Sequence, residues 1–204
     1  GQVNITTQKR QPGSSIKPVT YALALSKGAS PSTLIDDSPI CFIVAGQPDY
    51  CPKNYDGRFH GQVTLRTALA SSYNIPAIKL LNSYGLSNMI SLAKQLGITT
   101  WDDSSRFGLS LTLGGGEVTM IDLASAYAVF ANSGLKTPIN PILSINKADG
   151  YSASIESNPN PIEVLSPSVA YQINSILADK NARSPAFGYN SILNLPGENV
   201  AVKT

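Results

Sequence analysis

The sequence predicts an α+β fold, a mixed α/β arrangement that is rich in helix and whose antiparallel sheet is incomplete within these 204 residues. Three observations support this class. Apolar residues recur at helical spacing in several segments, which Gly, Pro and Asn signals separate. Only two segments, 141–145 and 198–204, are good candidates for strands. Apolar residues make up 42% of the chain, which is enough for a substantial core at this length.

The first predicted helix covers residues 14–27. It follows the turn signal Pro12-Gly13 and carries an apolar periodic run that ends at Lys27. Pro18 is compatible with this helix because N–H groups of the first turn have no intrahelical partner. Residues 28–62 contain repeated Pro and Gly and are predicted to be mostly loop.

The next segment predicts two helices joined by a turn. Thr64 is the expected N-cap of a helix that continues to residue 70. Residues 71–74 form the expected turn, and Ile75-Pro76 opens a further helix that ends at Gly85. Side chains on such a turn can face a cleft together.

The rest of the chain predicts three further helices. One covers residues 87–96, and a second runs from the capping-box pattern that begins at Thr119 to about residue 132. Ser166-Pro167 has the signature of an N-cap followed by proline and starts a helix that runs to about residue 178. Loops are expected at 157–161 and 181–196.

Three short motifs occur in order along the chain: Ser14-Ser15-Ile16-Lys17, Ser72-Tyr73-Asn74 and Lys203-Thr204. Each motif is weak by itself, and Ser-x-x-Lys also occurs at Ser91, Ser133 and Ser144. Only the copy at Ser14 follows a turn, opens a helix and precedes the other two motifs at suitable spacing. This context makes Ser14 and Lys17 the candidate reactive pair.

The chemistry of serine acyl transfer needs these residue types. A serine hydroxyl is a poor nucleophile at neutral pH and requires a base within hydrogen-bond reach. Lys17, one helical turn from Ser14, can act as that base only when neutral, so burial and a neighbouring cation must lower its pKa. Lys203 is the candidate cation. A helix N-terminus at Ser14 would favour the developing oxyanion.

The sequence resembles the transpeptidase domain of class A, bifunctional penicillin-binding proteins, which belong to the penicillin-recognising serine transferases. The segments that carry the resemblance span nearly the whole chain in the family's order: 10–18, 55–61, 63–77, 113–119, 124–127, 185–188 and 201–204. The resemblance implies a β-lactamase/transpeptidase-like fold. It also implies that residues 1–204 are a partial transpeptidase domain, comprising the helical core and the start of the Lys-Thr-Gly strand.

The resemblance implies a role for each catalytic residue. Ser14 corresponds to the nucleophile that attacks the penultimate D-alanine carbonyl of a peptidoglycan stem peptide and expels the terminal D-alanine. Lys17 corresponds to the base. Ser72 corresponds to a hydroxyl that relays a proton between the lysines and the leaving amine.

The resemblance also implies the binding residues and the partners. Asn74 would hold the substrate backbone, and Lys203 and Thr204 would receive the substrate carboxylate. An acceptor amine of a neighbouring stem peptide would then resolve the acyl-enzyme into a cross-link. β-Lactams resemble the D-Ala-D-Ala end and would acylate the same serine.

The chain departs from the family pattern at its ends. The glycine of Lys-Thr-Gly would follow Thr204, and the family's oxyanion hole combines the N–H of the nucleophile with an N–H two residues beyond that threonine. We therefore expect an internal fragment of a longer protein, with a glycosyltransferase domain and a membrane anchor upstream. The parent protein is expected at the extracytoplasmic face of the bacterial cytoplasmic membrane, and the isolated fragment is expected to be inactive or unstable.

Two other functions use the same motifs. One is a penicillin-binding sensor domain that is acylated without turnover, and the other is a β-lactamase, in which water resolves the acyl-enzyme. The rich similarity outside the motifs disfavours a sensor. The lack of an evident deacylating base disfavours a β-lactamase, because Glu117 beside three glycines is expected to have a structural role.

Composition excludes several other classes. A net charge of +2 with dispersed Lys and Arg provides no basic patch, so no nucleic-acid binding is expected. No apolar stretch approaches 18 residues, so no transmembrane segment is predicted. No cofactor is expected. Cys41 and Cys51 form either a disulfide in an oxidising compartment or two free thiols, and with the lone His60 they fit no usual zinc spacing.

Overall fold

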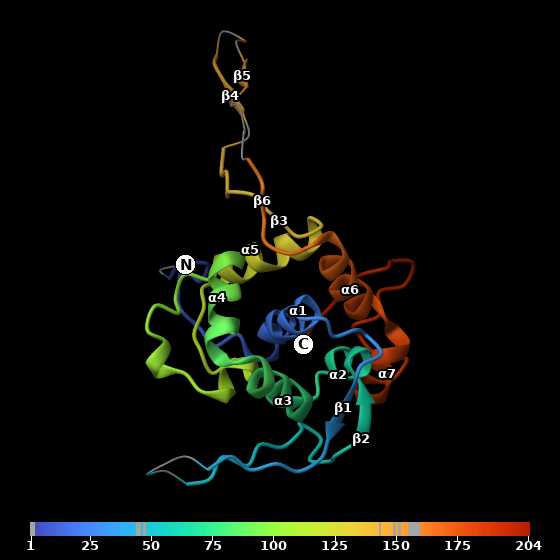
Figure 1. Cartoon of the computed structure of the whole chain (residues 1–204). Helices are drawn as coiled ribbons and strands as arrows, with labels where there is room; N and C mark the ends of the chain where they lie inside the picture. Colours follow the sequence, from blue (N-terminus) through green and yellow to red (C-terminus); the bar gives the residue numbers. More distant parts are fainter. Residues whose placement is uncertain are drawn as a thin grey trace.

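Helix α1 (Lys17–Ser26) lies at the centre of the fold (Figure 1). The computed structural model describes residues 3–43, 46, 48–142, 144–148, 150, 152–154 and 160–204. Every residue of α1 from Lys17 to Leu25 is buried, as expected of a helix that is covered on all sides. It packs against α2 (Leu65–Ala70), α3 (Asn74–Tyr84), α4 (Leu86–Leu96) and α6 (Pro167–Ala178).

The other helices complete this shell. Helix α5 (Met120–Ala131) packs on α4 and α6, and α7 (Lys180–Phe187) packs on α2. Three short 3-10 helices are η1 (Gly13–Ile16), η2 (Ser104–Arg106) and η3 (Leu109–Leu113). The helices η1 and η3 contact each other, and η3 also contacts α3.

N-cap side chains explain where several helices begin. Thr64, Thr119 and Ser166 each accept a hydrogen bond from a backbone N–H of the helix that follows, which confirms the three predicted caps. Such a cap contributes about 0.5–2 kcal/mol. The capping box at Thr119 is only half formed, because the carboxylate of Asp122 accepts from the N–H and hydroxyl of Thr99, both at 2.8 Å.

Three two-stranded antiparallel sheets occur in the described residues. Strand β1 (Leu34–Asp37) pairs with β2 (Gly61–Thr64), β3 (Leu135–Lys136) with β6 (Ile162–Glu163), and β4 (Ser144–Asn146) with β5 (Ser152–Ser154). The β1–β2 pair corrects the prediction of a stretch that is mostly loop up to residue 62. A local pattern does not predict this pair, because two of the four β1 residues are polar and the partner strand lies about 25 residues away.

The prediction of a strand at 198–204 is wrong for the described chain. The segment is extended but unpaired, and its long-range backbone hydrogen bond runs from the N–H of Val202 to the carbonyl of Leu177 at 3.0 Å. A strand needs a neighbouring strand to satisfy its backbone groups. The strand predicted at 141–145 is shifted towards β4, and Leu143 lies outside the described residues.

The loop predicted at 181–196 contains helix α7. Asp179 caps it by accepting from the N–H of Ala182 at 2.9 Å. Arg183 is buried and donates to the carbonyl of Leu177 at 2.7 Å and to the amide oxygen of Asn194 at 3.1 Å. These tertiary contacts stabilise α7 as a helix, although the Pro and Asn residues of the segment predict a loop. Of the other predicted loop, 157–159 lie outside the described residues.

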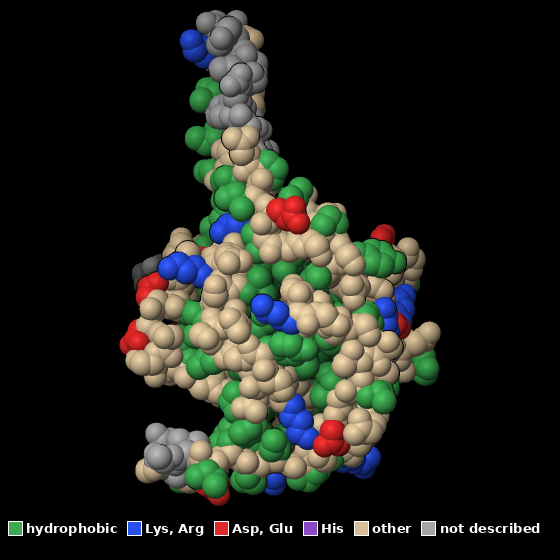
Figure 2. Space-filling model, in the orientation of Figure 1, with side chains coloured by type: hydrophobic (Ala, Val, Ile, Leu, Met, Phe, Trp, Pro, Cys, Tyr) green, Lys and Arg blue, Asp and Glu red, His purple; other side chains and the backbone are tan. Residues whose placement is uncertain are grey.

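An arm made of β3, β6 and the β4–β5 hairpin projects from the helical body (Figure 1). Exposed isoleucines lie along it: Ile139, Ile142, Ile145 and Ile162. On the face shown in Figure 2, Lys and Arg side chains are dispersed, with no continuous basic patch on its described residues. Within the described residues, no helix is long and apolar enough to cross a membrane.

Cys41 and Cys51 are joined by a disulfide, which decides between the two alternatives that the sequence left open. The bond closes a loop between β1 and β2. The same loop carries an isolated bridge between Phe42 and Tyr50, whose rings stack with their centroids 6.3 Å apart. The segment that follows, residues 52–60, leads back into the helical body and towards the start of α3.

Candidate active site

The predicted motifs meet at one open cavity of about 610 Å³. Four separate parts of the chain line it: the η1 turn, the loop that carries Tyr55, the segment between α2 and α3, and α7 with the C-terminal residues. The lining residues are Ser14, Tyr55, Asp56, Ser71, Ser72, Tyr73, Asn74, Pro185, Ala186, Phe187 and Thr204. Glu117 is exposed and is not among these lining residues.

Ser14 lies in the 3-10 turn η1, directly before α1, rather than within the first α-helical turn that was predicted. Its backbone is supported from outside. The phenol of Tyr127 donates to the carbonyl of Ser15 at 2.8 Å. Gly114 packs so closely on Gly13 that an added Cβ would lie 2.3 Å from the Gly13 nitrogen. The turn that presents Ser14 is therefore built by residues about 100 positions away.

Lys17 is the first residue of α1, and its side chain is fully buried at 0% exposure. Its amine donates to the carbonyl of Ser72 at 2.5 Å and to Oδ1 of Asn74 at 2.7 Å, and lies 3.4 Å from the Ser72 hydroxyl. Burial lowers the pKa of Lys17 to about 6, with a further contribution from the charge of Lys203. The amine is therefore mostly neutral at pH 7 and able to accept a proton.

Ser72 occupies a strained position between α2 and α3. Its φ of +61° lies in the left-handed region, which non-glycine residues adopt only when the surroundings impose it. Its hydroxyl accepts from the amine of Lys203 at 2.7 Å and donates to the carbonyl of Thr204 at 3.3 Å. The hydroxyl thus lies between two amines, a geometry suited to passing a proton.

Thr204 lines the cavity and Lys203 contacts the Ser72 hydroxyl, although neither residue forms a strand within the described chain. Burial lowers the pKa of Lys203 to about 7, so this amine carries a partial positive charge at neutral pH. It also donates to the carbonyl of Thr204. Thr204 is exposed at the cavity wall.

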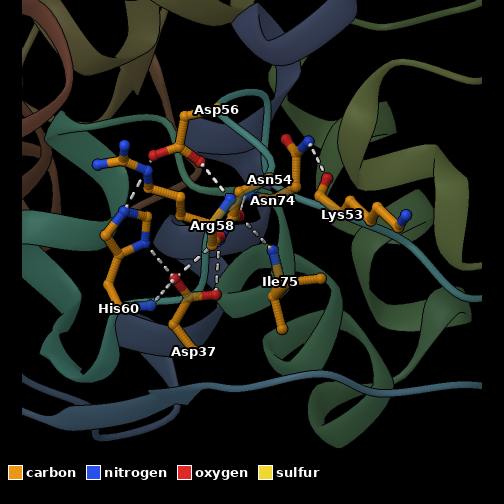
Figure 3. Close-up of polar contacts among 8 residues, drawn as sticks. All are labelled: Asp37, Lys53, Asn54, Asp56, Arg58, His60, Asn74 and Ile75. Carbon is orange, nitrogen blue, oxygen red and sulfur yellow. Dashed lines mark hydrogen bonds and ion pairs between the residues drawn. The ribbon is translucent and has the colours of Figure 1, made fainter.

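Asn74 is the first residue of α3, whereas the sequence predicts it in the preceding turn. Its Nδ2 donates to the carbonyl of Lys53 at 2.8 Å, while its Oδ1 accepts from Lys17. Lys53 and its neighbour Asn54, shown in Figure 3, were not predicted as site residues. The only sequence signal for them is their place just before Tyr55, where the family resemblance resumes.

His60 lies between two acidic side chains. Its ring nitrogens lie against two carboxylates, with Nδ1 at 2.6 Å from Asp37 and Nε2 at 3.1 Å from Asp56 (Figure 3). The described residues contain no group of three or more His, Cys, Asp or Glu side chains that could hold a metal ion.

Comparison with known proteins agrees with this geometry. The model of the penicillin binding protein transpeptidase domain family matches residues 2–204. The chain belongs to this family. Among curated relatives, penicillin-binding protein 1A of Neisseria meningitidis is 36% identical over 176 residues, covering 83% of this chain and 22% of the relative. The transpeptidase chain thus spans about a fifth of the length of such relatives.

Solved structures support the family fold. Penicillin-binding protein 1A from Haemophilus influenzae superposes with a TM-score of 0.79 at 28% identity, covering 98% of this chain and 33% of that one. PonA1 from Mycobacterium tuberculosis superposes with a TM-score of 0.77 at 24% identity, covering 96% and 52% of the two chains, which bears on the fold alone. The predicted α+β, transpeptidase-like fold is confirmed.

Proposed function

We propose that this transpeptidase domain is a serine D,D-transpeptidase that cross-links peptidoglycan and is acylated by β-lactams. The observation that carries the proposal is the placement of two amines of lowered pKa, Lys17 and Lys203, on either side of the Ser72 hydroxyl. Ser14 opens on the same cavity. Family membership supports the general activity, acyl transfer.

Acylation begins at Ser14. Its hydroxyl oxygen attacks the carbonyl of the penultimate D-alanine of a stem peptide, and the hydroxyl proton passes to the neutral amine of Lys17. The C–N bond to the terminal D-alanine then breaks. The Ser72 hydroxyl, 2.7 Å from the amine of Lys203, supplies the proton that the leaving amine needs and is reprotonated by the lysine behind it. The product is an ester of Ser14 and free D-alanine.

Deacylation reverses the proton path. An acceptor amine of a neighbouring stem peptide attacks the ester carbonyl and loses a proton through Ser72 to a lysine. The C–O bond to Ser14 breaks and the serine recovers its proton, leaving a new peptide cross-link. A β-lactam would acylate Ser14 through its ring carbonyl. The C–N bond of its ring would then break, as the bond to the terminal D-alanine does in the stem peptide.

Substrate binding is assigned to three polar residues, of which Asn74 and Thr204 line the cavity and Lys203 contacts Ser72. Asn74 keeps one amide hydrogen and one lone pair beyond its bonds to Lys53 and Lys17, which suits it to hold a peptide backbone. The charge of Lys203 and the hydroxyl of Thr204 would receive the substrate carboxylate. No observation favours a sensor or a β-lactamase over this assignment.

The proposed location is the extracytoplasmic face of the bacterial cytoplasmic membrane, reached through an anchor of a longer parent protein. A disulfide between Cys41 and Cys51 agrees with an oxidising compartment. The proposed partners are therefore the stem peptides of peptidoglycan and the β-lactams that reach them.

The test is acylation by a fluorescent penicillin, read by intact mass. A longer protein that contains this domain is expected to gain one adduct at Ser14, and its Ser14→Ala variant is expected to lose that adduct. Ser91→Ala is the matched control, since Ser91 begins another Ser-x-x-Lys and is exposed on α4. Labelling that survives Ser14→Ala, or an unlabelled longer protein, would contradict the assignment of Ser14.

A second measurement separates transpeptidation from the related functions. The chain is incubated with a D-Ala-D-Ala stem peptide and an acceptor amine, and both free D-alanine and the cross-linked product are measured. Cross-linked product with equal D-alanine is expected. Acylation without turnover would indicate a sensor, and rapid hydrolysis of the penicillin adduct would indicate a β-lactamase.

A further inference from the structure

Helix α3 receives its N-terminal cap from a distant loop. Tyr73, the residue at its own N-cap position, makes no capping hydrogen bond through its side chain. Instead Oδ1 of Asn54 accepts from the N–H of Asn74 at 2.8 Å and from the N–H of Ile75 at 3.3 Å. The next residue, Pro76, has no N–H. Asn54 therefore satisfies the first N–H groups of α3, the role normally played by a local Ser, Thr, Asp or Asn.

The orientation of Asn54 follows from its other partners (Figure 3). Its Nδ2 donates to both carboxylate oxygens of Asp37, at 2.9 and 2.8 Å, and to the carbonyl of Arg58 at 2.8 Å. With acceptors on this side, the amide oxygen has to face the helix. Asn54 is only 4% exposed and Asp37 is 0% exposed, so water does not compete strongly for these bonds.

His60 completes the arrangement. Asp37 also accepts from the backbone N–H of His60 at 3.1 Å and faces its Nδ1 at 2.6 Å. The imidazole stacks on the ring of Tyr73, with centroids 3.9 Å apart and planes inclined by 9°. The buried carboxylate thus orients both the capping amide and the ring that covers the middle of the Ser72-Tyr73-Asn74 motif.

We propose that Asn54, held by Asp37, is a positioning residue that places Asn74 and, through it, the amine of Lys17 for acylation. Asn74 contributes Oδ1 as one of the acceptors of that amine, at 2.7 Å. The backbone of Asn74 is in turn held by Asn54. A shift of the start of α3 would therefore move Lys17 relative to Ser14. The inference rests on the proposed function for its catalytic part.

Asn54→Ala is expected to lower the rate constant of acylation by a penicillin about 10- to 100-fold, because displacement of a reacting group by about 1 Å costs on that order. The dissociation constant of the initial penicillin complex should change much less. Asn88→Ala is the matched control. The Asn88 amide donates to the carbonyl of Tyr84 at 2.8 Å, at the opposite end of α3 and away from the cavity lining, so this variant should acylate normally.

An exchange of the two buried groups distinguishes positioning from general damage. Asn54→Asp alone sets two carboxylates against each other in a buried site and should be the most impaired variant. Adding Asp37→Asn restores one donor and one acceptor across the pair. A carboxylate at position 54 can still accept from the N–H groups of α3, where the helix dipole favours it. The double variant should recover part of the lost acylation rate, because the carbonyl of Arg58 still lacks the donor that Asn54 supplies.

Amide hydrogen exchange, measured residue by residue on the full chain, supplies a readout that needs no activity. Asn54→Ala should accelerate exchange at Asn74 and Ile75, and Asn88→Ala should not. Normal acylation by a folded Asn54→Ala, or no recovery in the double variant, would overturn the inference. If the unmodified chain is not acylated at all, the proposed function fails and the catalytic part fails with it. The exchange data then still decide whether Asn54 caps α3.

Discussion

Replacing Lys17 with methionine is expected to stabilise the folded chain at neutral pH and to abolish its acylation. The lysine is fully buried at the start of α1, and methionine is apolar and of similar length. The structure thus keeps a group that chemistry needs at the expense of stability, as is common at active sites.

The magnitude follows from the pKa of Lys17, which is 10.5 as an ordinary value and about 6 in the folded chain. Folding at pH 7 therefore requires loss of a proton, which costs roughly 5 kcal/mol at about 1.4 kcal/mol per pH unit. Methionine removes that cost. It also leaves the oxygens of Ser72 and Asn74 without a donor, which costs about 1–3 kcal/mol for the two together because both residues are partly exposed to water. The expected net stabilisation at pH 7 is about 2–4 kcal/mol.

The sign of the pH dependence is fixed by the lowered pKa. Between pH 6 and 10.5 the unfolded chain binds more protons at Lys17 than the folded chain, so wild-type stability rises with pH in this window. The gain from Lys17→Met should consequently shrink by about 1.4 kcal/mol for each unit of pH. Lys203 titrates in both proteins, so the difference reports mainly on Lys17.

The assay is urea unfolding at pH 7, 8 and 9, with Lys94→Met as control. Lys94 ends another Ser-x-x-Lys and is exposed on α4, so its replacement should leave the slope of stability against pH unchanged. A gain that is independent of pH or grows with it would refute the reasoning. So would destabilisation by Lys17→Met at pH 7.

Two further predictions concern the glycine that packs on the Ser14 turn and the disulfide. Gly114 has a φ of +96°, and a Cβ added there would lie 2.3 Å from the Gly13 nitrogen. Gly114→Ala should therefore displace the turn of Ser14 and lower penicillin labelling at least about tenfold. Unchanged labelling would contradict this prediction. Replacing Cys41 and Cys51 together with serine should lower the free energy of unfolding by about 2–3 kcal/mol, measured by urea denaturation. An unchanged urea midpoint would show that the disulfide does not constrain the unfolded chain as expected.

Local signals predicted most of the helices. Thr64, Thr119 and Ser166 each carry a hydroxyl that can accept from the first turn, and the structure uses all three in this way. The same local reasoning missed β1 and β2, because a strand is stabilised by a partner that no local window contains. It also missed α7, whose Arg183 is held by contacts outside the helix.

The candidate site was predictable in its residues but not in its environment. The three motifs by themselves identify Ser14, Lys17 and Ser72 as candidate reactive groups. No pattern indicated Asn54 or Asp37, since neither belongs to a motif and both act through packing against a distant helix.

The amino-acid sequence by itself determined the chemistry available to this protein: two serines, two lysines and an amide in a family order, on a chain that forms helices. Only the tertiary structure decided how that chemistry is tuned. Lys203 meets Ser72 across 131 positions of sequence, and burial lowers the pKa values of Lys17 and Lys203. The physical reason is that a pKa depends on solvent exclusion and on charges a few ångströms away, which arise only when distant segments pack together.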